Sequence, residues 1–402
     1  MQRLRNILLA GLVMATFAVS AQEKKEDEKE KGYQFTSVNE IPCTSVKDQY
    51  RSGTCWSFSG LALLEAEMLR LGKPVVDLSE MFVVYHTYSD KALKYVRLHG
   101  SLNFGAGGAF HDVTNVIGKY GVVPEEVYSG LNYGEEKHVH GEIDRTLLDQ
   151  VKVIVDNPNK KLTSVWFDAF NNTLDTYFGK LPESFKYQGK DYTPLLFAQE
   201  FMGLNMDDYV EISSYTHHPF YTKFIIEIPD NWSWDEVYNV PMNELEEIID
   251  NSINTGYTVA WAADVSEKGF STSQKGVAVI PDVDKANMTD AEISKWEKQT
   301  EKERNEELYK LSKPGTEKLI TQEMRQIDFD NYQTTDDHGM LIIGTAKDQN
   351  GNIYYKVKNS WGDYNDYDGY FYASKPYVKY KTMSIMVHKD AIPKNIRKKL
   401  NL

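Results

Sequence analysis

Four residues of the types that thiol-based amide hydrolysis requires occur in order along this chain of 402 residues. Gln49 precedes Cys55 by six residues, and His338 and Asn359 follow far downstream. A thiolate can attack a carbonyl carbon, an imidazole can move the proton, and side-chain amides can orient the imidazole or donate to an oxyanion. Each residue alone has an ordinary structural explanation. Together, in this order, they predict a cysteine nucleophile with a histidine base.

Cys55 is predicted to stand in the first turn of a helix of about 17 residues. Thr54 is a favourable N-cap residue, apolar residues then recur at three- and four-residue steps, and Gly72 closes the run. The partial positive charge at a helix N-terminus stabilises a thiolate, so we expect the pKa of the Cys55 thiol to fall below its free value of about 8.5. The Gln49 side chain is placed to donate to an oxyanion beside the Cys55 backbone N–H.

The base and its orienting partner are predicted to lie on a β-hairpin. Residues 340–346 and 353–358 are rich in β-formers, and a turn-forming stretch separates them. If the loop spans 348–351, Asn359 lies opposite the residue two positions beyond His338. Positions two apart on a strand share a face, about 7 Å apart, so the two side chains would reach each other.

Trp361 follows Asn359 by two residues and is expected to shield the His338–Asn359 hydrogen bond from water. A structural histidine at a strand edge and an asparagine in a turn are the alternative interpretations. The matching positions of the two residues, with Cys55 upstream, favour the catalytic interpretation.

The first 21 residues have the pattern of a signal peptide. Two arginines precede an apolar run that ends in a small-residue cleavage pattern at Ala21. We therefore expect a secreted or periplasmic protein without a stable membrane anchor, with a signal anchor as the alternative. Residues 22–33 are almost wholly charged and predict a disordered spacer before a peptidase domain at 34–402.

The charge balance argues against a nucleic-acid partner. The formal net charge is −14, and removal of the two signal-peptide arginines would make it −16. Binding to phosphates depends on lysine and arginine, so an acidic chain is unsuited to it. The only cysteines are Cys43 and Cys55, so no disulfide framework is predicted. A bridge between them is the alternative, and it would block the proposed nucleophile.

Histidine pairs are the remaining candidates for metal ligands. His138 and His140 form one pair, and His217 and His218 form the other. No Cys, Asp or Glu completes a recognisable ligand spacing around them, so we expect solvent-exposed histidines, no metal and no cofactor. The highly charged stretch 284–323 is expected to form solvated helices, with a partner-binding helix as the alternative.

The catalytic constellation resembles that of the papain-like cysteine peptidases, whose nucleophile signature is Cys-Gly-Ser/Ala-Cys-Trp/Tyr. Ser52 stands where the first Cys of that signature would be, so the disulfide that it forms is absent. The resemblance implies that Gln49 is the oxyanion-hole amide and Cys55 the nucleophile. It implies that His338 is the base and Asn359 its orienting residue.

Two further segments extend the resemblance. Leu78-Ser79-Glu80 resembles the start of the family's next helix. The glycine cluster that ends in Gly107 and Gly108 resembles the wall that holds a substrate backbone, so these two glycines are predicted to bind substrate.

Within that family, the chain is similar to the bleomycin hydrolase and aminopeptidase C branch. His338 follows Cys55 by 283 residues, which suits the large insertion of that branch, here at about 135–325. Stretches at 119–125, 191–195, 256–265 and 336–340 also look like it. The resemblance implies an α+β papain-like fold with a helical subdomain, a β-barrel-like subdomain and a cleft for extended peptides.

Members of this branch are homohexamers in which a C-terminal arm restricts cleavage to amino-terminal residues. The corresponding arm, at about 388–402, is expected to be shorter here. The resemblance therefore implies an aminopeptidase and a possible homohexamer, with an endopeptidase as the first alternative. A catalytically silent binding protein of the same fold is the second.

Overall fold

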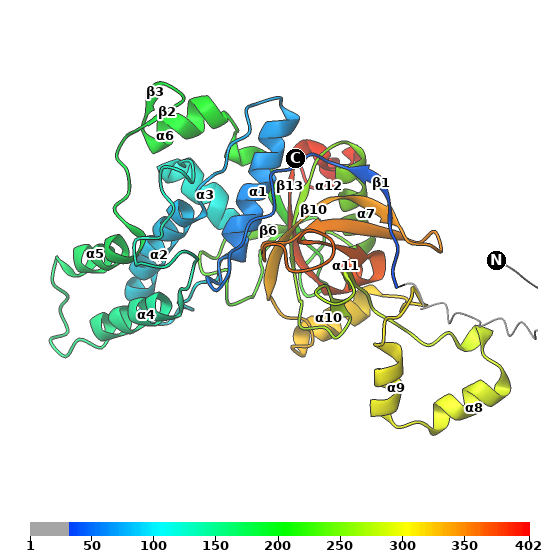
Figure 1. Cartoon of the computed structure of the whole chain (residues 1–402). Helices are drawn as coiled ribbons and strands as arrows, with labels where there is room; N and C mark the ends of the chain where they lie inside the picture. The colour runs from blue at the N-terminus through cyan, green and yellow to red at the C-terminus, as the bar shows by residue number, and fades with distance from the viewer. Residues whose placement is uncertain (1–31) are drawn as a thin grey trace, which may run out of the picture.

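Helices and strands separate into two parts of the molecule, with α1 (Cys55–Arg70) between them (Figure 1). The structure is a computed structural model and describes residues 32–402. The predicted signal peptide and residues 22–31 of the predicted spacer lie outside the described residues. The mainly helical part and the sheet-rich part confirm the predicted α+β architecture.

The helical part is built on α1, which is buried from Trp56 to Met68. It starts and ends close to the predicted bounds. The next helix begins at the predicted Leu-Ser-Glu motif, where the Ser79 hydroxyl accepts from the Phe82 N–H at 3.1 Å. The other elements are α2 (Glu80–Arg97), α3 (Phe110–Tyr120), α4 (Gly141–Val155), α5 (Trp166–Phe178), α6 (Pro194–Leu196) with a π-helical turn (Phe197–Met202), and the hairpin β2 (Phe185–Tyr187) and β3 (Lys190–Tyr192).

The second part is one mixed sheet. The order of its main path is β5-β6-β4-β13-β7-β10-β11-β12-β9-β8, and β1 also pairs with β10. All pairs are antiparallel except β4–β6 and β9–β12. The strands are β1 (Thr36–Glu40), β4 (Tyr209–Ser213), β5 (Lys223–Ile225), β6 (Glu236–Asn239), β7 (Val259–Ala263), β8 (Phe270–Ser271), β9 (Val277–Ala278), β10 (His338–Lys347), β11 (Ile353–Lys358), β12 (Tyr370–Ser374) and β13 (Thr382–His388).

Strand β10 separates two hydrophobic cores. Leu341 and Ile343 belong to the core shared with the helical part, whereas Met340 and Ile342 belong to the core on the opposite face. This alternation is the period of two expected for a strand that is buried on both faces. Helices α7 (Met242–Asn254), α11 (Lys375–Lys381) and α12 (Lys394–Lys399) contribute to the second core.

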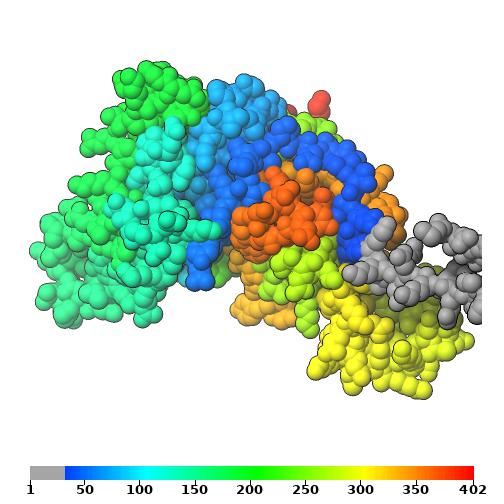
Figure 2. Space-filling view, in the orientation of Figure 1, coloured from blue at the N-terminus to red at the C-terminus, as the bar shows by residue number. Residues whose placement is uncertain are grey.

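The predicted charged helices are α8 (Asp290–Lys298) and α9 (Glu301–Leu308), followed by α10 (Gln322–Asp330). Helices α8 and α9 form a lobe that projects from the sheet-rich part, at the end opposite α4 and α5 (Figures 1 and 2). No side chain of α9 is buried, in agreement with the solvated helices predicted for this stretch.

Two predicted boundaries can be compared with the sheet and its core. The range 135–325, predicted as an insertion, contains β7, which pairs with both β10 and β13, so this strand belongs to the main sheet. The disordered spacer cannot extend through Tyr33, which is buried and packs with Leu311 and Tyr354. In both cases the contacts are made with segments far away in the sequence.

The C-terminal segment 388–402 packs on the sheet-rich part. Ile396 and Leu400 are buried in the second core, and Lys399 pairs with Glu244 of α7 at 2.6 Å. The Asn251 side chain, also from α7, donates to the Ala391 carbonyl at 2.6 Å. Within residues 32–402, no helix is long and apolar enough to cross a membrane.

Candidate active site

The β10–β11 hairpin brings His338 and Asn359 together. The turn is one residue longer than predicted, since Lys347 pairs with Ile353. A bulge between Ile342 and Gly344 restores the predicted register, so Leu341 pairs with Lys358. The His338 Nε2 and Asn359 Oδ1 atoms lie 2.7 Å apart.

The hydrogen bonds of Asn359 fix the orientation of its amide and, through it, the imidazole. Its Oδ1 also accepts from the Ser360 backbone N–H at 2.8 Å, and its Nδ2 donates to the Tyr364 hydroxyl at 3.1 Å. Because Oδ1 can only accept, His338 Nε2 must carry the hydrogen. The Nδ1 atom is then left with a lone pair, as a general base requires.

Trp361, predicted to shield the His338–Asn359 hydrogen bond, stacks on the imidazole. The ring centroids of His338 and Trp361 are 4.7 Å apart, with an angle of 27° between the planes. Phe270 and Tyr364 contact the indole edge-on at 6.1 and 5.4 Å. His338 and Asn359 are both buried, and the stacked indole limits rotation of the imidazole.

Cys55 is the first residue of α1 and lines a pocket together with His338. The backbone N–H groups of Gly339 and Trp56 are directed at its sulfur and favour the thiolate. Gly339 also lies against α1, where a Cβ would come within 2.7 Å of Ser59 Oγ. The close approach of β10 to α1 therefore places the residue after His338 beside Cys55, the predicted nucleophile.

Burial opposes ionisation of both groups. It raises the pKa of the Cys55 thiol to about 12, and the charges of Asp336 and Asp230 contribute in the same direction. Burial lowers the pKa of His338 to about 4, although the hydrogen bond with Asn359 opposes this effect. The shift of the thiol pKa is opposite to the predicted lowering, because desolvation outweighs the backbone N–H groups of Gly339 and Trp56. Thr54 also makes no side-chain cap.

Gln49 is held by Ser360, a contact that the sequence did not reveal. Its Oε1 accepts from the Ser360 hydroxyl at 2.6 Å, and its backbone N–H donates to the Ser360 carbonyl at 2.8 Å. Among the described residues, nothing accepts from its Nε2 group. That group is available to donate to an oxyanion, in line with the predicted role. The Cys55 N–H, at the start of a helix, likewise lacks an intrahelical acceptor.

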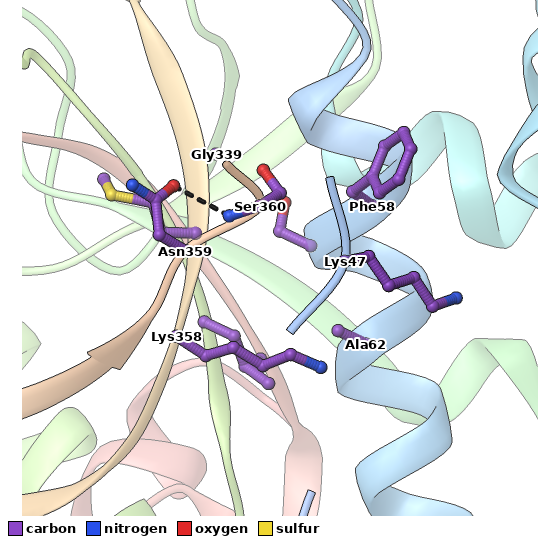
Figure 3. A pocket seen from close by; sticks show the side chains of 10 residues that line it. Lys47, Phe58, Ala62, Gly339, Lys358, Asn359 and Ser360 are labelled. Carbon is purple, nitrogen blue, oxygen red and sulfur yellow. Dashed lines mark hydrogen bonds between the residues drawn. The ribbon is translucent and has the colours of Figure 1, made fainter. Parts of the chain in front are cut away.

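A network of charged residues secures the segment that carries Gln49. Lys47 contacts Glu65 of α1 at 3.0 Å and Glu80 of α2 at 2.6 Å. Figure 3 shows that Lys47 and Phe58 line a second pocket opposite Asn359 and Ser360. This pocket lies between α1 and the hairpin and contains neither Cys55 nor His338 in its lining.

The predicted glycine wall borders the Cys55 pocket. Trp56 Nε1 donates to the Ala106 carbonyl at 3.0 Å, and a Cβ on Gly108 would come within 2.8 Å of the Trp56 ring. The buried ammonium of Lys91 donates to the carbonyls of Gly105 and Gly107 at 2.9 and 2.5 Å. Lys91 thus fixes the backbone of the wall, a role that no sequence motif indicated.

Acidic side chains gather in the Cys55 pocket. Glu211, Asp230, Asp336 and Asp337 all line it. Asp336 and Asp337 stand directly before His338, whereas Glu211 lies on β4 and Asp230 lies between β5 and β6. Their convergence depends on tertiary structure, and no spacing in the sequence identifies it.

The histidine pairs differ from the prediction. His138 and His140 are buried, and burial lowers their pKa values to about 4 and about 3. They adjoin the segment before α1, where the Arg51 N–H donates to the His138 carbonyl at 2.9 Å. They are structural residues, so the expectation of solvent exposure is wrong for this pair.

The second histidine pair has an acidic neighbour after all. His217 Nε2 and His218 Nε2 each lie 3.0 Å from a carboxylate oxygen of Glu227. This exposed set of donors could hold a metal ion or simply form hydrogen bonds. It is not part of the Cys55 pocket. Both cysteines are free thiols, and Cys43 Sγ lies 3.9 Å from the Tyr370 hydroxyl.

The sequence model of the peptidase C1-like family matches residues 95–402, which is more than half of the chain. The chain belongs to the peptidase C1-like family. The matched range includes His338 and Asn359 and begins after the Cys55 helix, which the similarity to individual relatives covers.

Curated relatives align with most of this chain. The chain is 22% identical to aminopeptidase C of Lactobacillus delbrueckii subsp. lactis, over 89% of its own length and 82% of the relative. It is 22% identical to aminopeptidase C of Streptococcus thermophilus, over 92% and 85%. The crystal structure of PepW from Lactobacillus rhamnosis HN001 is similar with a TM-score of 0.67 and 18% identity, over 91% of this chain and 84% of PepW. The papain-like α+β fold is thereby confirmed.

Proposed function

We propose that this protein is an exported cysteine aminopeptidase that uses Cys55, His338 and Asn359, with Gln49 in the oxyanion hole. The observation that carries the proposal is the fixed imidazole. His338 Nε2 is bound to Asn359, which leaves Nδ1 as a base in the pocket that Cys55 lines. Family membership and the aminopeptidase C relatives support the reaction class.

Burial raises the pKa of the Cys55 thiol and lowers that of His338, which favours a proton on the sulfur before the reaction begins. Cys55 Sγ attacks the carbonyl carbon of the peptide while His338 takes the thiol proton. The oxyanion accepts from Gln49 Nε2 and from the Cys55 backbone N–H. His338 then protonates the leaving amine, and water hydrolyses the thioester with His338 again as base.

The two cysteines provide a matched test. Cys55→Ala is expected to abolish hydrolysis of fluorogenic aminoacyl amides and labelling by a thiol-reactive peptidyl probe. Cys43→Ala removes the other thiol and is expected to retain both. Hydrolysis that survives in Cys55→Ala would disprove the mechanism. Absence of labelling in the wild type would favour the catalytically silent binding protein.

An endopeptidase is the second candidate, because the C-terminal segment packs against α7 and contributes no residue to the Cys55 pocket. Among the described residues, the C-terminal segment 388–402 therefore does not block the Cys55 pocket of its own chain. Peptides with an acetylated N-terminus distinguish the candidates. Internal cleavage of such peptides would exclude a strict aminopeptidase.

Export and assembly are separate parts of the proposal. The arginine-flanked apolar run of residues 1–21 supports export, and mass spectrometry of the mature protein is expected to find Gln22 at its N-terminus. The homohexamer implied by the resemblance remains a prediction. Light scattering of the purified mature protein would measure its mass and identify any other state.

A further inference from the structure

The carboxylates around Cys55 divide into two classes by their partners. Glu211 has two partners: its Oε2 lies 2.8 Å from His111 Nδ1, and its Oε1 accepts from the Ser384 hydroxyl at 2.5 Å. Asp337 accepts from the backbone N–H groups of Val265 and Ser266, both at 3.1 Å. These two acids serve the internal structure.

Asp230 and Asp336 lack comparable partners inside the protein. Within residues 32–402, Asp336 has no hydrogen bond or ion pair, and Asp230 accepts only from Asn103 Nδ2 at 3.3 Å. Lys91 acts electrostatically on Asp230, but its ammonium donates its hydrogen bonds to the carbonyls of Gly105 and Gly107 in the glycine wall. Burial raises the pKa of both carboxyl groups, and the charge of Asp230 raises that of Asp336 further.

Asp230 and Asp336 are both partly buried. Carboxylates withdrawn from water without a counter-ion are destabilising, so proteins normally pair them. Both acids line the pocket that contains the nucleophile, and both act electrostatically on the Cys55 thiol. A cation that enters this pocket would compensate both charges. A peptide substrate is the molecule that must enter it for the reaction to occur.

Asp230 is also in contact with the glycine wall. A Cβ added to Gly107 would overlap the Asp230 carboxylate, so the carboxylate lies directly against this glycine. Gly107 is one of the two residues predicted to hold a substrate backbone. The acidic site is therefore continuous with the predicted path of the peptide and close to the scissile bond.

We propose that Asp230 and Asp336 form a recognition site for a cationic group of the peptide substrate, an inference that rests on the proposed peptidase function. The group is an ammonium or a guanidinium. It is supplied either by the free α-amino terminus or by a lysine or arginine side chain beside the cleavage site. Charge-assisted hydrogen bonds to both carboxylates give the enzyme its selectivity.

Matched fluorogenic amides test the two sources. Aminoacyl and dipeptidyl amides, each with a free or an acetylated α-amino group, measure recognition of the amino terminus. Acetylated dipeptidyl amides with arginine or its neutral isostere citrulline before the scissile residue measure recognition of a side chain. At least one pair is expected to show a preference of about tenfold or more in kcat/KM for the cationic member.

Asp336→Asn and Asp230→Asn are each expected to reduce that preference by about tenfold. Glu236→Gln removes one exposed acid of β6 outside the pocket and is expected to leave both the preference and the activity unchanged. Thermal unfolding checks the fold of each variant. Removal of an uncompensated charge should not lower Tm, whereas loss of a structural partner would.

The possible failures are distinguishable. Hydrolysis by the wild type without any preference for the cationic member would overturn this inference and leave the proposed function standing. A preference that both aspartate variants retain would also overturn it. Failure of the wild type to hydrolyse any of the amides or to react with the peptidyl probe would refute the proposed function, and the inference with it.

Discussion

Ser360 holds Gln49 by its carbonyl end. The Ser360 hydroxyl donates to Gln49 Oε1 at 2.6 Å, so the amide nitrogen is the end that remains available to a substrate. The residue after the orienting asparagine thus positions the amide that precedes the nucleophile by six residues. One turn of chain after β11 thus orients both the proposed base, His338, and the proposed oxyanion donor, Gln49.

Loss of the Ser360 hydroxyl is expected to lower kcat by roughly tenfold, because the Gln49 amide could then rotate away from the oxyanion. The effect on KM should be smaller, since the oxyanion exists only in the transition state. Steady-state kinetics of Ser360→Ala on a fluorogenic aminoacyl amide measure both constants.

Gln49→Ala sets the upper limit of the effect, at about 100-fold in kcat for loss of one oxyanion donor. Ser360→Thr keeps the hydroxyl and serves as the matched control. Full kcat in Ser360→Ala would show that Gln49 does not need this contact.

The pH dependence of kcat/KM should report the buried imidazole. The base must be unprotonated, and the pKa of His338 is lowered to about 4, so kcat/KM is expected to rise as the pH increases through about 4. The hydrogen bond to Asn359 raises this pKa. Asn359→Ala should therefore move the acid limb to lower pH and also reduce kcat, because the ring loses its orientation.

Tyr364→Phe is the control for this profile. It removes the acceptor of Asn359 Nδ2 and leaves the Asn359 Oδ1 atom that binds His338. The acid limb is expected to stay in place, with a smaller loss of kcat. An acid limb that moves to higher pH in Asn359→Ala would contradict the assigned direction of the hydrogen bond.

Lys91 is expected to support substrate binding through the glycine wall. Its ammonium joins the carbonyls of Gly105 and Gly107. The wall would hold the substrate backbone equally in the ground state and the transition state. Lys91→Met should therefore raise KM several-fold with a smaller change in kcat. Lys119→Met, which removes an exposed lysine paired with Asp90, should change neither. A loss confined to kcat would assign Lys91 a different role.

The β10–β11 hairpin shows which features could be predicted from the sequence and which could not. The pairing that brings Asn359 to His338 was predicted, because both strands and the turn are locally encoded. The extra turn residue and the compensating bulge were not. The bulge lies beside Gly344, where a Cβ would overlap the Asn39 carbonyl of β1. This close contact is made with a strand about 300 residues earlier, which no local pattern contains.

The same limit explains the pKa error at Cys55. Helix position is readable from the sequence, and α1 starts where it was predicted. Desolvation is not readable, because it depends on β10, on the glycine wall and on the acids that surround the pocket. For the same reason, the proximity of Asp230 and Asp336 could not be predicted from the sequence, since only the folded chain brings them near each other.

Glu125 provides a test of stability away from the active site. Its Oε2 is buried without a partner among the described residues. Burial raises its pKa from 4.5 to about 8, and the charge of Glu80 adds to the effect while Lys47 opposes it. Between these pH values the folded chain keeps a proton that the unfolded chain releases. The stability present below pH 4.5 is therefore lost as the pH rises to about 8.

Glu125→Gln removes this ionisation and should raise Tm by about 2 °C or more at pH 8, with no gain at pH 4.5. Glu126→Gln changes the adjacent exposed acid and is the matched control. Calorimetry of the three proteins at both pH values measures the difference. An equal change in Tm at the two pH values would mean that altered packing, rather than the buried charge, determines the effect of Glu125.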